Sequence, residues 1–275
     1  MTDDPYLQIA GHLPNEVALG GALITMVEPD HGHEHAYNRW YEDDHFYSGA
    51  MVGPWMLSGR RWVATRDLLA LRFPIDSPIA RPVSAGCYIS TYWISAGHYA
   101  DARRWGEVAM RDHLYPQGRG FDHRQHIYTA FSPYEFGVIN DDEPHLLPHH
   151  TLDRPFPGMV VEVIEPGRDA AREDVLRELR DRVIPAELAG SPIAAVLAFT
   201  PQPQPDSGPV PRVGSAAGAG HNVTLLWFLR CDPRVCWSQF VRHGERISAA
   251  NATVVFAAPF VPTIPGTDTY VNELR

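Results

Sequence analysis

The chain has 275 residues and a formal net charge of −10, and all 23 of its Lys and Arg positions are arginine. Because lysine is missing, pyridoxal phosphate enzymes, Schiff-base aldolases, P-loop nucleotide hydrolases and protein kinases are excluded. The acidic balance also argues against a nucleic-acid partner, since phosphate neutralisation needs a basic face.

The composition, 44% hydrophobic and 20% charged, is that of a globular protein. No run of 18 apolar residues predicts a transmembrane helix, so no membrane partner is expected. The opening Met-Thr-Asp-Asp-Pro lacks the basic and apolar regions of a signal peptide. The cysteines Cys87, Cys231 and Cys236 have no zinc spacing and fit reduced thiols. We therefore expect a cytoplasmic protein.

The same succession of elements is predicted twice along the chain. The first half is expected to contain strands at 22–27, 55–65, 86–95 and 126–131 and helices at 34–47 and 99–113. The second half is expected to contain strands at 159–164, 193–200, 222–230 and 253–258 and helices at 170–187 and 234–248. Each half therefore has the order β-α-β-β-α-β, which is the ferredoxin-like arrangement.

Local sequence echoes support the repeat. Val27-Glu28-Pro29 ends the first strand and Ile164-Glu165-Pro166 ends its counterpart, and the first helices align at an offset of 138 (172 − 34). A proline-rich segment separates the halves and predicts a linker. The predicted domains are residues 1–139 as the candidate active repeat, 140–157 as the linker, and 158–275 as a repeat with a degenerate pocket.

One face of the first helix differs between the two copies. Asn38, Tyr41 and His45 share a stripe at helical spacing, and the offset aligns them with Leu176, Leu179 and Val183. Burying polar groups costs a few kcal/mol unless each is hydrogen-bonded. A polar stripe where the sister copy is apolar therefore predicts a pocket between helix and sheet in the first half.

The motif Asn38-x-Trp40-Tyr41-x-x-x-His45, followed by Gly53-Pro54-Trp55 and Gly59-Arg60-Arg61-Trp62, resembles the dimeric α+β barrel superfamily, and within it EthD-like proteins. A proline commonly follows that histidine in the family, whereas Phe46 follows it here. The resemblance implies an α+β fold in which the two tandem ferredoxin-like repeats form an intramolecular α+β barrel. It also leaves a homodimer possible.

The resemblance implies catalysis without a cofactor on a small hydrophobic substrate, often an aromatic or polyketide-like compound. We expect a lyase, cyclase or isomerase in which His45 titrates near neutral pH and takes a proton. Tyr41 would donate to an enolate oxygen, and Asn38 would orient a carbonyl. The predicted substrate-binding residues are aromatic: Trp40, Tyr88, Trp93 and Trp62. Strand alternation separates Tyr88 from Trp93, so they do not all face one cavity.

Four other interpretations of the sequence stay open. His31, His33 and His35, with a second group at His145, His149 and His150, are dense in metal ligands, although no metal is expected. Tandem ferredoxin-like chains include chlorite dismutase-like and dye-peroxidase-like haem proteins, for which His243 is a candidate proximal ligand. The barrel could also act as a cofactor-free monooxygenase or as a non-catalytic binder of a hydrophobic ligand.

Overall fold

The computed structural model describes residues 17–204 and 214–275. The opening residues, on which the signal-peptide prediction rests, lie outside this range. The first half contains the strands β1 (Leu19–Pro29), β2 (Met56–Val63), β3 (Tyr88–Ser95) and β4 (Arg124–Ile139). Its helices are α2 (Glu34–Trp40), α3 (Arg66–Leu69) and α4 (Tyr99–Val108). Helix α2 continues as π-helical turns over Tyr41–His45 and Tyr47–Met51, and α4 as one over Ala109–Leu114.

The second half repeats this order. Its strands are β5 (Gly158–Pro166), β6 (Ile193–Phe199), β7 (Val223–Leu229) and β8 (Ala252–Pro262). Its helices are α5 (Arg172–Glu178), α6 (Ile184–Leu188) and α7 (Pro233–Ile247), with a π-helical turn over Leu179–Val183 between the first two. Short 3-10 turns lie at Pro148–Thr151, Ser248–Ala250 and Val271–Glu273.

The repeat predicted from the sequence is present in the backbone. Helices α2 and α5 begin 138 residues apart (172 − 34), and so do the π-helical turns that follow them (179 − 41). Because both copies carry the π-helical turn at the same place, it belongs to the shared architecture rather than to a site in one copy.

The eight strands form a closed barrel in the order β1-β3-β2-β8-β5-β7-β6-β4. Within each half the order is that of a ferredoxin-like sheet, and every recorded pairing is antiparallel. The halves join where β2 pairs with β8 and where β4 pairs with β6. The predicted fold class, two tandem ferredoxin-like repeats in one α+β barrel, is confirmed.

Strand β4 is much longer than predicted. It has 16 residues because its first part, to Pro133, pairs with β1 and its last part, from Tyr134, pairs with β6 of the other half. The proline lies at the change of partner, where its carbonyl accepts from the Thr200 amide. Proline is rare within paired strands, and here it stands where the strand changes partner.

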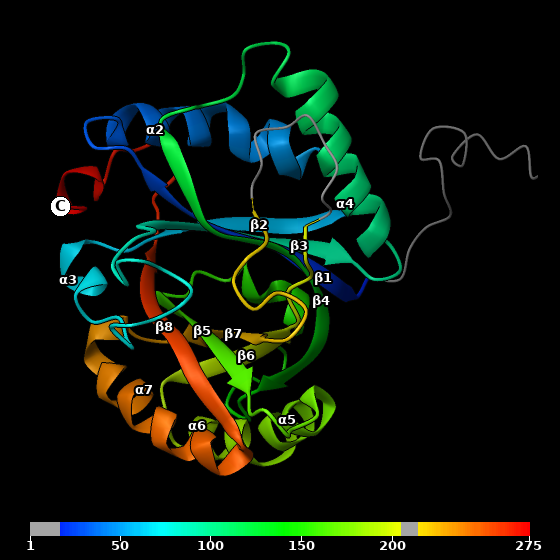
Figure 1. Cartoon of the computed structure of the whole chain (residues 1–275), viewed down its shortest axis with the longest axis vertical. Helices are drawn as coiled ribbons and strands as arrows, with labels where there is room; N and C mark the ends of the chain where they lie inside the picture. The colour runs from blue at the N-terminus through cyan, green and yellow to red at the C-terminus, as the bar shows by residue number, and fades with distance from the viewer. Residues whose placement is uncertain (1–16, 205–213) are drawn as a thin grey trace, which may run out of the picture.

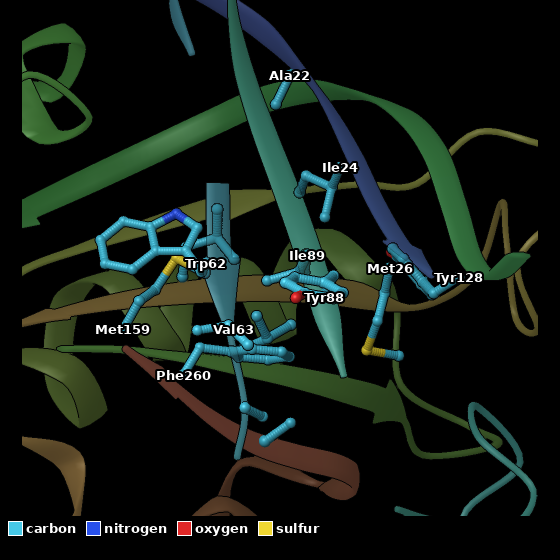
Figure 2. Close-up of a cluster of buried hydrophobic side chains, with 14 of the residues drawn as sticks. Ala22, Ile24, Met26, Trp62, Val63, Tyr88, Ile89, Tyr128, Met159 and Phe260 are labelled. Atoms are coloured by element: carbon cyan, nitrogen blue, oxygen red, sulfur yellow. The ribbon is translucent and has the colours of Figure 1, made fainter. Parts of the chain in front are cut away.

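The helices cover the outside of the barrel, with α2 and α4 over one half and α5, α6 and α7 over the other (Figure 1). Apolar side chains fill the inside, where Trp62 lies near Met159 (Figure 2). Strand β3 is buried along its whole length because one face meets this interior and the other meets the helices. No helix within the described ranges is long and apolar enough to cross a membrane.

Phe228 is expected to hold the two halves together. Its ring is fully buried and lies 6.2 Å from Trp62, 6.3 Å from Trp93 and 5.6 Å from Phe156 between ring centroids. Phe228→Ala should lower the free energy of unfolding by about 3–5 kcal/mol, because the cavity cannot collapse inside a closed barrel. Denaturant unfolding measures this, with the exposed Tyr47→Ala as control. Equal losses in the two variants would contradict the assignment.

Candidate functional site

Helix α2 lies on the outer face of the first sheet and buries Tyr37, Asn38 and Tyr41 against it. Gly59 of β2 permits this close packing. A Cβ atom there would lie 2.6 Å from the Met51 sulfur and 2.7 Å from the Tyr92 ring. Any side chain at this position would push the helix away from the strand, so the glycine fixes the depth of the site.

Arg61 of β2 is the buried charge at the centre of this interface. Its guanidinium carbon lies 4.1 Å from the ring centroid of Tyr88, and 4.7 and 5.3 Å from those of Tyr41 and Tyr37. Its Nη1 atom donates to Asn38 Oδ1 at 2.5 Å and to Glu42 Oε1 at 3.2 Å. Three aromatic faces and one carboxylate therefore offset part of the cost of burying this cation, whose Nε and Nη2 atoms have no hydrogen-bond partner among the described residues.

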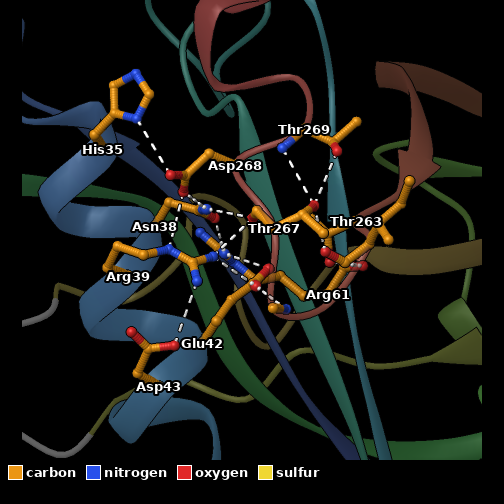
Figure 3. Close-up of polar contacts among 12 residues, drawn as sticks. His35, Asn38, Arg39, Glu42, Asp43, Arg61, Thr263, Thr267, Asp268 and Thr269 are labelled. Carbon is orange, nitrogen blue, oxygen red and sulfur yellow. Dashed lines mark hydrogen bonds and ion pairs between the residues drawn. The ribbon is translucent and has the colours of Figure 1, made fainter.

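The amide of Asn38 is fully used by the protein. Besides accepting from Arg61, it donates to the Thr267 carbonyl at 3.0 Å and to Asp268 Oδ1 at 2.9 Å (Figure 3). Arg39 adds an ion pair to Asp268 at 2.9 Å. Asn38 therefore fastens the C-terminal segment (residues 263–275) to α2. It has no free group with which to orient a substrate carbonyl, which corrects the catalytic role expected from the sequence.

The hydroxyl of Tyr41 is hydrogen-bonded to the hydroxyl of Tyr92 at 2.7 Å, and both side chains are buried. Burial, and the Tyr41 hydroxyl beside it, raise the pKa of Tyr92 well above its ordinary value. Both phenols are therefore hydrogen-bonded to each other rather than aimed at an open space. Donation by Tyr41 to an enolate would require this pair to open.

His45 is held beside Trp40. The two rings stack at 4.2 Å between centroids with an interplanar angle of 21°, and the Tyr41 ring meets the imidazole edge-on at 5.3 Å. The buried Nδ1 atom has no hydrogen-bond partner among the described residues. Burial, and after it the charge of Arg124, lower the pKa of His45 to about 3. The expectation that His45 titrates near neutral pH is therefore wrong: the imidazole is neutral.

Two residues of β4 complete this part of the site, and sequence reasoning missed both. Arg124 lies over the Trp40 ring at 4.4 Å and donates from Nε to His126 Nε2 at 3.3 Å. Its buried Nη1 atom has no hydrogen-bond partner among the described residues. His126 Nδ1 is 2.9 Å from the Thr129 hydroxyl. The sequence signal that could have found them is the alternation of side chains along a strand, because residues 124 and 126 point to the same face of the sheet.

His126 is exposed, but desolvation by the surrounding atoms and the charge of Arg124 lower its pKa. The imidazole is therefore neutral at pH 7, and its Nε2 atom can accept the hydrogen bond from Arg124. Arg124 is thus held in place by His126 on one side and by the hydroxyl of Tyr115 on the other, which accepts from Nη2 at 3.1 Å. The Nη1 atom of Arg124 is therefore a hydrogen-bond donor without a partner among the described residues.

A cavity of about 220 Å³ lies between the continuation of α2 and the helix α4. Its walls are mostly apolar: Ser48, Trp105, Val108, Ala109, His113 and Leu114. His45 is not among the lining residues, and the wall residue Ser48 lies three positions after it in the chain. A Cβ atom on Gly49 would lie 2.9 Å from His45 Cε1 and 3.0 Å from the Met110 methyl group, so this glycine lets the two segments approach closely.

The four aromatic residues predicted to bind substrate lie in two separate places, two of them at the interface between α2 and the sheet and two inside the barrel. Trp40 contacts His45, and Tyr88 packs against Arg61 under α2. Trp62 and Trp93 instead point into the barrel interior, where their indole nitrogens donate to Thr91 and Thr151. Strand alternation puts these two tryptophans on the opposite face of the sheet from α2. Their expected role as substrate-binding residues beside His45 is therefore corrected.

The matching space in the second half is filled. Leu179 and Val183, which occupy the positions of Tyr41 and His45, are buried in an apolar cluster with Val160, Leu225 and Phe240. The polar stripe is therefore a feature of the first copy alone among these matched positions. Its side chains are hydrogen-bonded against the sheet, and the cavity lies between the continuation of α2 and α4 rather than between helix and sheet as predicted.

His243 of α7 does not fit an axial haem ligand. Its Nε2 atom is 3.2 Å from Glu162 and its Nδ1 atom 3.1 Å from Glu187, and the side chain is 1% exposed. The two carboxylates outweigh the effect of burial and raise the pKa of His243 to about 9. Both nitrogens therefore carry protons at neutral pH, so neither offers a lone pair to iron.

The other histidine groups are also engaged. His33 stacks on His123 at 3.7 Å, and His35 Nε2 is hydrogen-bonded to Asn272 at 2.9 Å. Across residues 17–204 and 214–275, no three His, Cys, Asp or Glu side chains are arranged to hold a metal ion.

No protein-family model matches the sequence, and no curated protein matches it. Among solved structures, a provisionally assigned chlorite dismutase matches 94% of this chain and 100% of its own, with 12% identity and a TM-score of 0.51. An anthrone oxidase-like protein matches 89% of this chain and 92% of its own, with 8% identity and a TM-score of 0.52. A haem-bound variant of DypB from Rhodococcus jostii RHA1 matches 90% of this chain and 94% of its own, with 11% identity and a TM-score of 0.50. At these identities the likeness shows the tandem α+β barrel fold.

The charge on His243 should make stability depend on pH. Its pKa is about 9 in the folded state against 6.5 for the free side chain, so its contribution is complete below pH 6.5 and is lost as pH rises through 9. The difference corresponds to about 3 kcal/mol. The wild-type free energy of unfolding should fall across this window, and that of His243→Gln should not. The exposed His31→Gln is the control. A similar decline in His243→Gln would contradict the assignment.

Proposed function

We propose that the first half carries an enzyme site that deprotonates a small aromatic or polyketide-like carbonyl compound without a cofactor. The observation that supports it most is the pair of unpartnered buried atoms, Nδ1 of His45 and Nη1 of Arg124, on side chains that both contact Trp40. One offers a lone pair for a proton and the other offers a donor for the anion that forms.

The low pKa of His45 makes it a weak base in the free protein. The bound substrate must therefore shift the equilibrium between the neutral and the protonated imidazole toward the protonated form. A negative charge that develops beside the ring favours the imidazolium, because opposite charges stabilise each other in a site with little water. Arg124 supports the same anion. The proton therefore moves from the acidic carbon or phenol to His45 while the enolate or phenolate oxygen binds the guanidinium.

The substrate in this proposal is a compact, flat molecule that enters the cavity between the continuation of α2 and α4. A cavity of about 150 Å³ holds a benzene ring, so one of about 220 Å³ accommodates a larger flat aromatic compound with fused rings. Trp40 is occupied by its contacts with His45 and Arg124, so Trp105 in the cavity wall provides the flat aromatic surface for the substrate. The EthD-like resemblance of the α2 motif implies substrates of the same kind.

The fate of the enolate defines the reaction class. Protonation at another atom gives an isomerase, loss of a group gives a lyase, and ring closure gives a cyclase. Reaction with dioxygen gives a monooxygenase, and the fold likeness to an anthrone oxidase-like protein supports this second candidate. A haem enzyme is not proposed, because His243 is doubly protonated between two carboxylates.

Replacing His45 tests the proton transfer directly. Anthrone is a suitable probe because it has an acidic CH₂ group beside two rings and exchanges hydrogen for deuterium through its enolate. The wild-type protein in D₂O without oxygen should accelerate this exchange, and His45→Ala should lower the acceleration at least about a hundredfold. Mass spectrometry measures the exchange. A loss of less than about tenfold would contradict the role of His45.

Two controls accompany this experiment. His113→Ala alters the cavity wall without removing the proposed base, so it should change the apparent affinity more than the rate. Repeating the reaction in air distinguishes the reaction classes, because an oxygenase converts anthrone and O₂ to anthraquinone and water, whereas an isomerase or lyase leaves the quinone yield unchanged.

Replacing Arg124 separates its two effects on the site. Arg124→Met keeps the length of the side chain and removes the charge that lowers the pKa of His45. The pKa of His45 should therefore rise, as measured by NMR titration of its Cε1 proton, while anthrone exchange slows at least about tenfold. A variant with a raised histidine pKa and undiminished exchange would show that Arg124 does not stabilise the anion.

A further inference from the structure

Two of the three cysteines face each other at the start of α7. The sulfur atoms of Cys231 and Cys236 are 3.5 Å apart, and neither cysteine is in a disulfide. Cys231 is half-buried, whereas Cys236 is buried. The chain between them is Asp232-Pro233-Arg234-Val235. The mechanism proposed for the first half uses neither thiol.

The local backbone holds the two thiols together. Asp232 caps the helix by accepting from the Arg234 amide at 2.9 Å, and Pro233 begins the helix with its fixed φ. The Cys236 sulfur also contacts the Pro233 carbonyl at 3.8 Å. Because the cap and the proline define this turn, the thiols are close together before any bond forms between them.

The segment between the thiols also contacts the other half of the protein. Arg234 Nε is 2.5 Å from Asp67 Oδ2, and its Nη2 atom donates to the Thr65 hydroxyl at 2.9 Å. Trp237, the next residue after Cys236, packs against Phe73 at 5.7 Å between ring centroids. A covalent change at the thiols therefore acts on a contact between α7 and the segment that follows β2.

We propose that Cys231 and Cys236 are a redox-active dithiol that closes to an intramolecular disulfide by exchange with a low-molecular-weight disulfide. The Cys231 thiolate attacks one sulfur of the external disulfide and releases the other as a thiol. The Cys236 sulfur then attacks Cys231 in the mixed disulfide while its proton passes to the departing thiolate, which leaves as the second thiol. The protein loses two protons and two electrons, which together equal two hydrogen atoms, and the external disulfide is reduced to two thiols.

The order of attack follows from the surroundings of each thiol. Burial, then the neighbouring Cys231 sulfur, raise the pKa of Cys236 to about 12, so this thiol is protonated at neutral pH. The half-buried Cys231 is the accessible partner for the first exchange. The third cysteine, Cys87, is buried in the core and far along the chain, and it serves as an internal control.

Oxidised glutathione provides the test on the folded full-length protein. The expected product has lost two hydrogen atoms, with peptide mapping showing a Cys231–Cys236 bond and Cys87 still reduced. The pair should react at least about ten times faster than Cys87. Cys236→Ser should stop at a mixed disulfide on Cys231, and Cys231→Ser should remain reduced.

A second measurement covers the case in which either serine variant fails to fold. Disulfides quench nearby indoles, so oxidation of the wild-type protein should lower tryptophan fluorescence reversibly, and dithiothreitol should restore it. Two results would overturn the proposal: a mixed disulfide that persists in the wild-type protein, or oxidation of all three cysteines at one rate.

Discussion

The buried guanidinium of Arg61 is the interaction on which the first half of the molecule depends. It joins β2, β3 and α2 through three tyrosine rings, and through Asn38 it reaches the C-terminal segment. A buried cation is tolerated only when its surroundings compensate the lost hydration. The polar residues of α2 therefore serve first to stabilise the buried charge of Arg61. The amide of Asn38 and the carboxylate of Glu42 both accept hydrogen bonds from it.

The proposed chemistry depends on the polar groups near α2 that the hydrogen bonds around Arg61 do not use. Asn38 and Glu42 are bound to Arg61, and the hydroxyls of Tyr41 and Tyr92 are bound to each other. His45, one turn further along the helix, lies beyond the network and keeps a free buried nitrogen. The same helix therefore has a structural part near its start, and the part near its end carries the proposed base and Ser48 of the cavity wall.

Sequence reasoning predicted the architecture well because the chain is a repeat, so the elements predicted in one half could be checked against those predicted in the other. The offset of 138 residues aligned α2 with α5 and their π-helical turns, and alternation located seven of the strands closely. The site was predicted less well because hydrogen-bond partners are not encoded in spacing. Asn38 meets Asp268, 230 residues away, and His45 comes near Arg124 only when β4 pairs with β1. The lowered pKa of His45 depends first on its burial and then on that charge.

The absence of lysine has a physical consequence within this fold. Burial lowers the pKa of a lysine readily, whereas a guanidinium keeps its charge. Arg72 illustrates this: it is fully surrounded by protein, and burial lowers its pKa only to about 10 while it donates to the Ala85 and Gly86 carbonyls. Arg61 and Arg124 face the same constraint. Fixed positive charges in apolar surroundings keep nearby imidazoles neutral, and a neutral imidazole beside a fixed cation is suited to receive a proton as an anion forms.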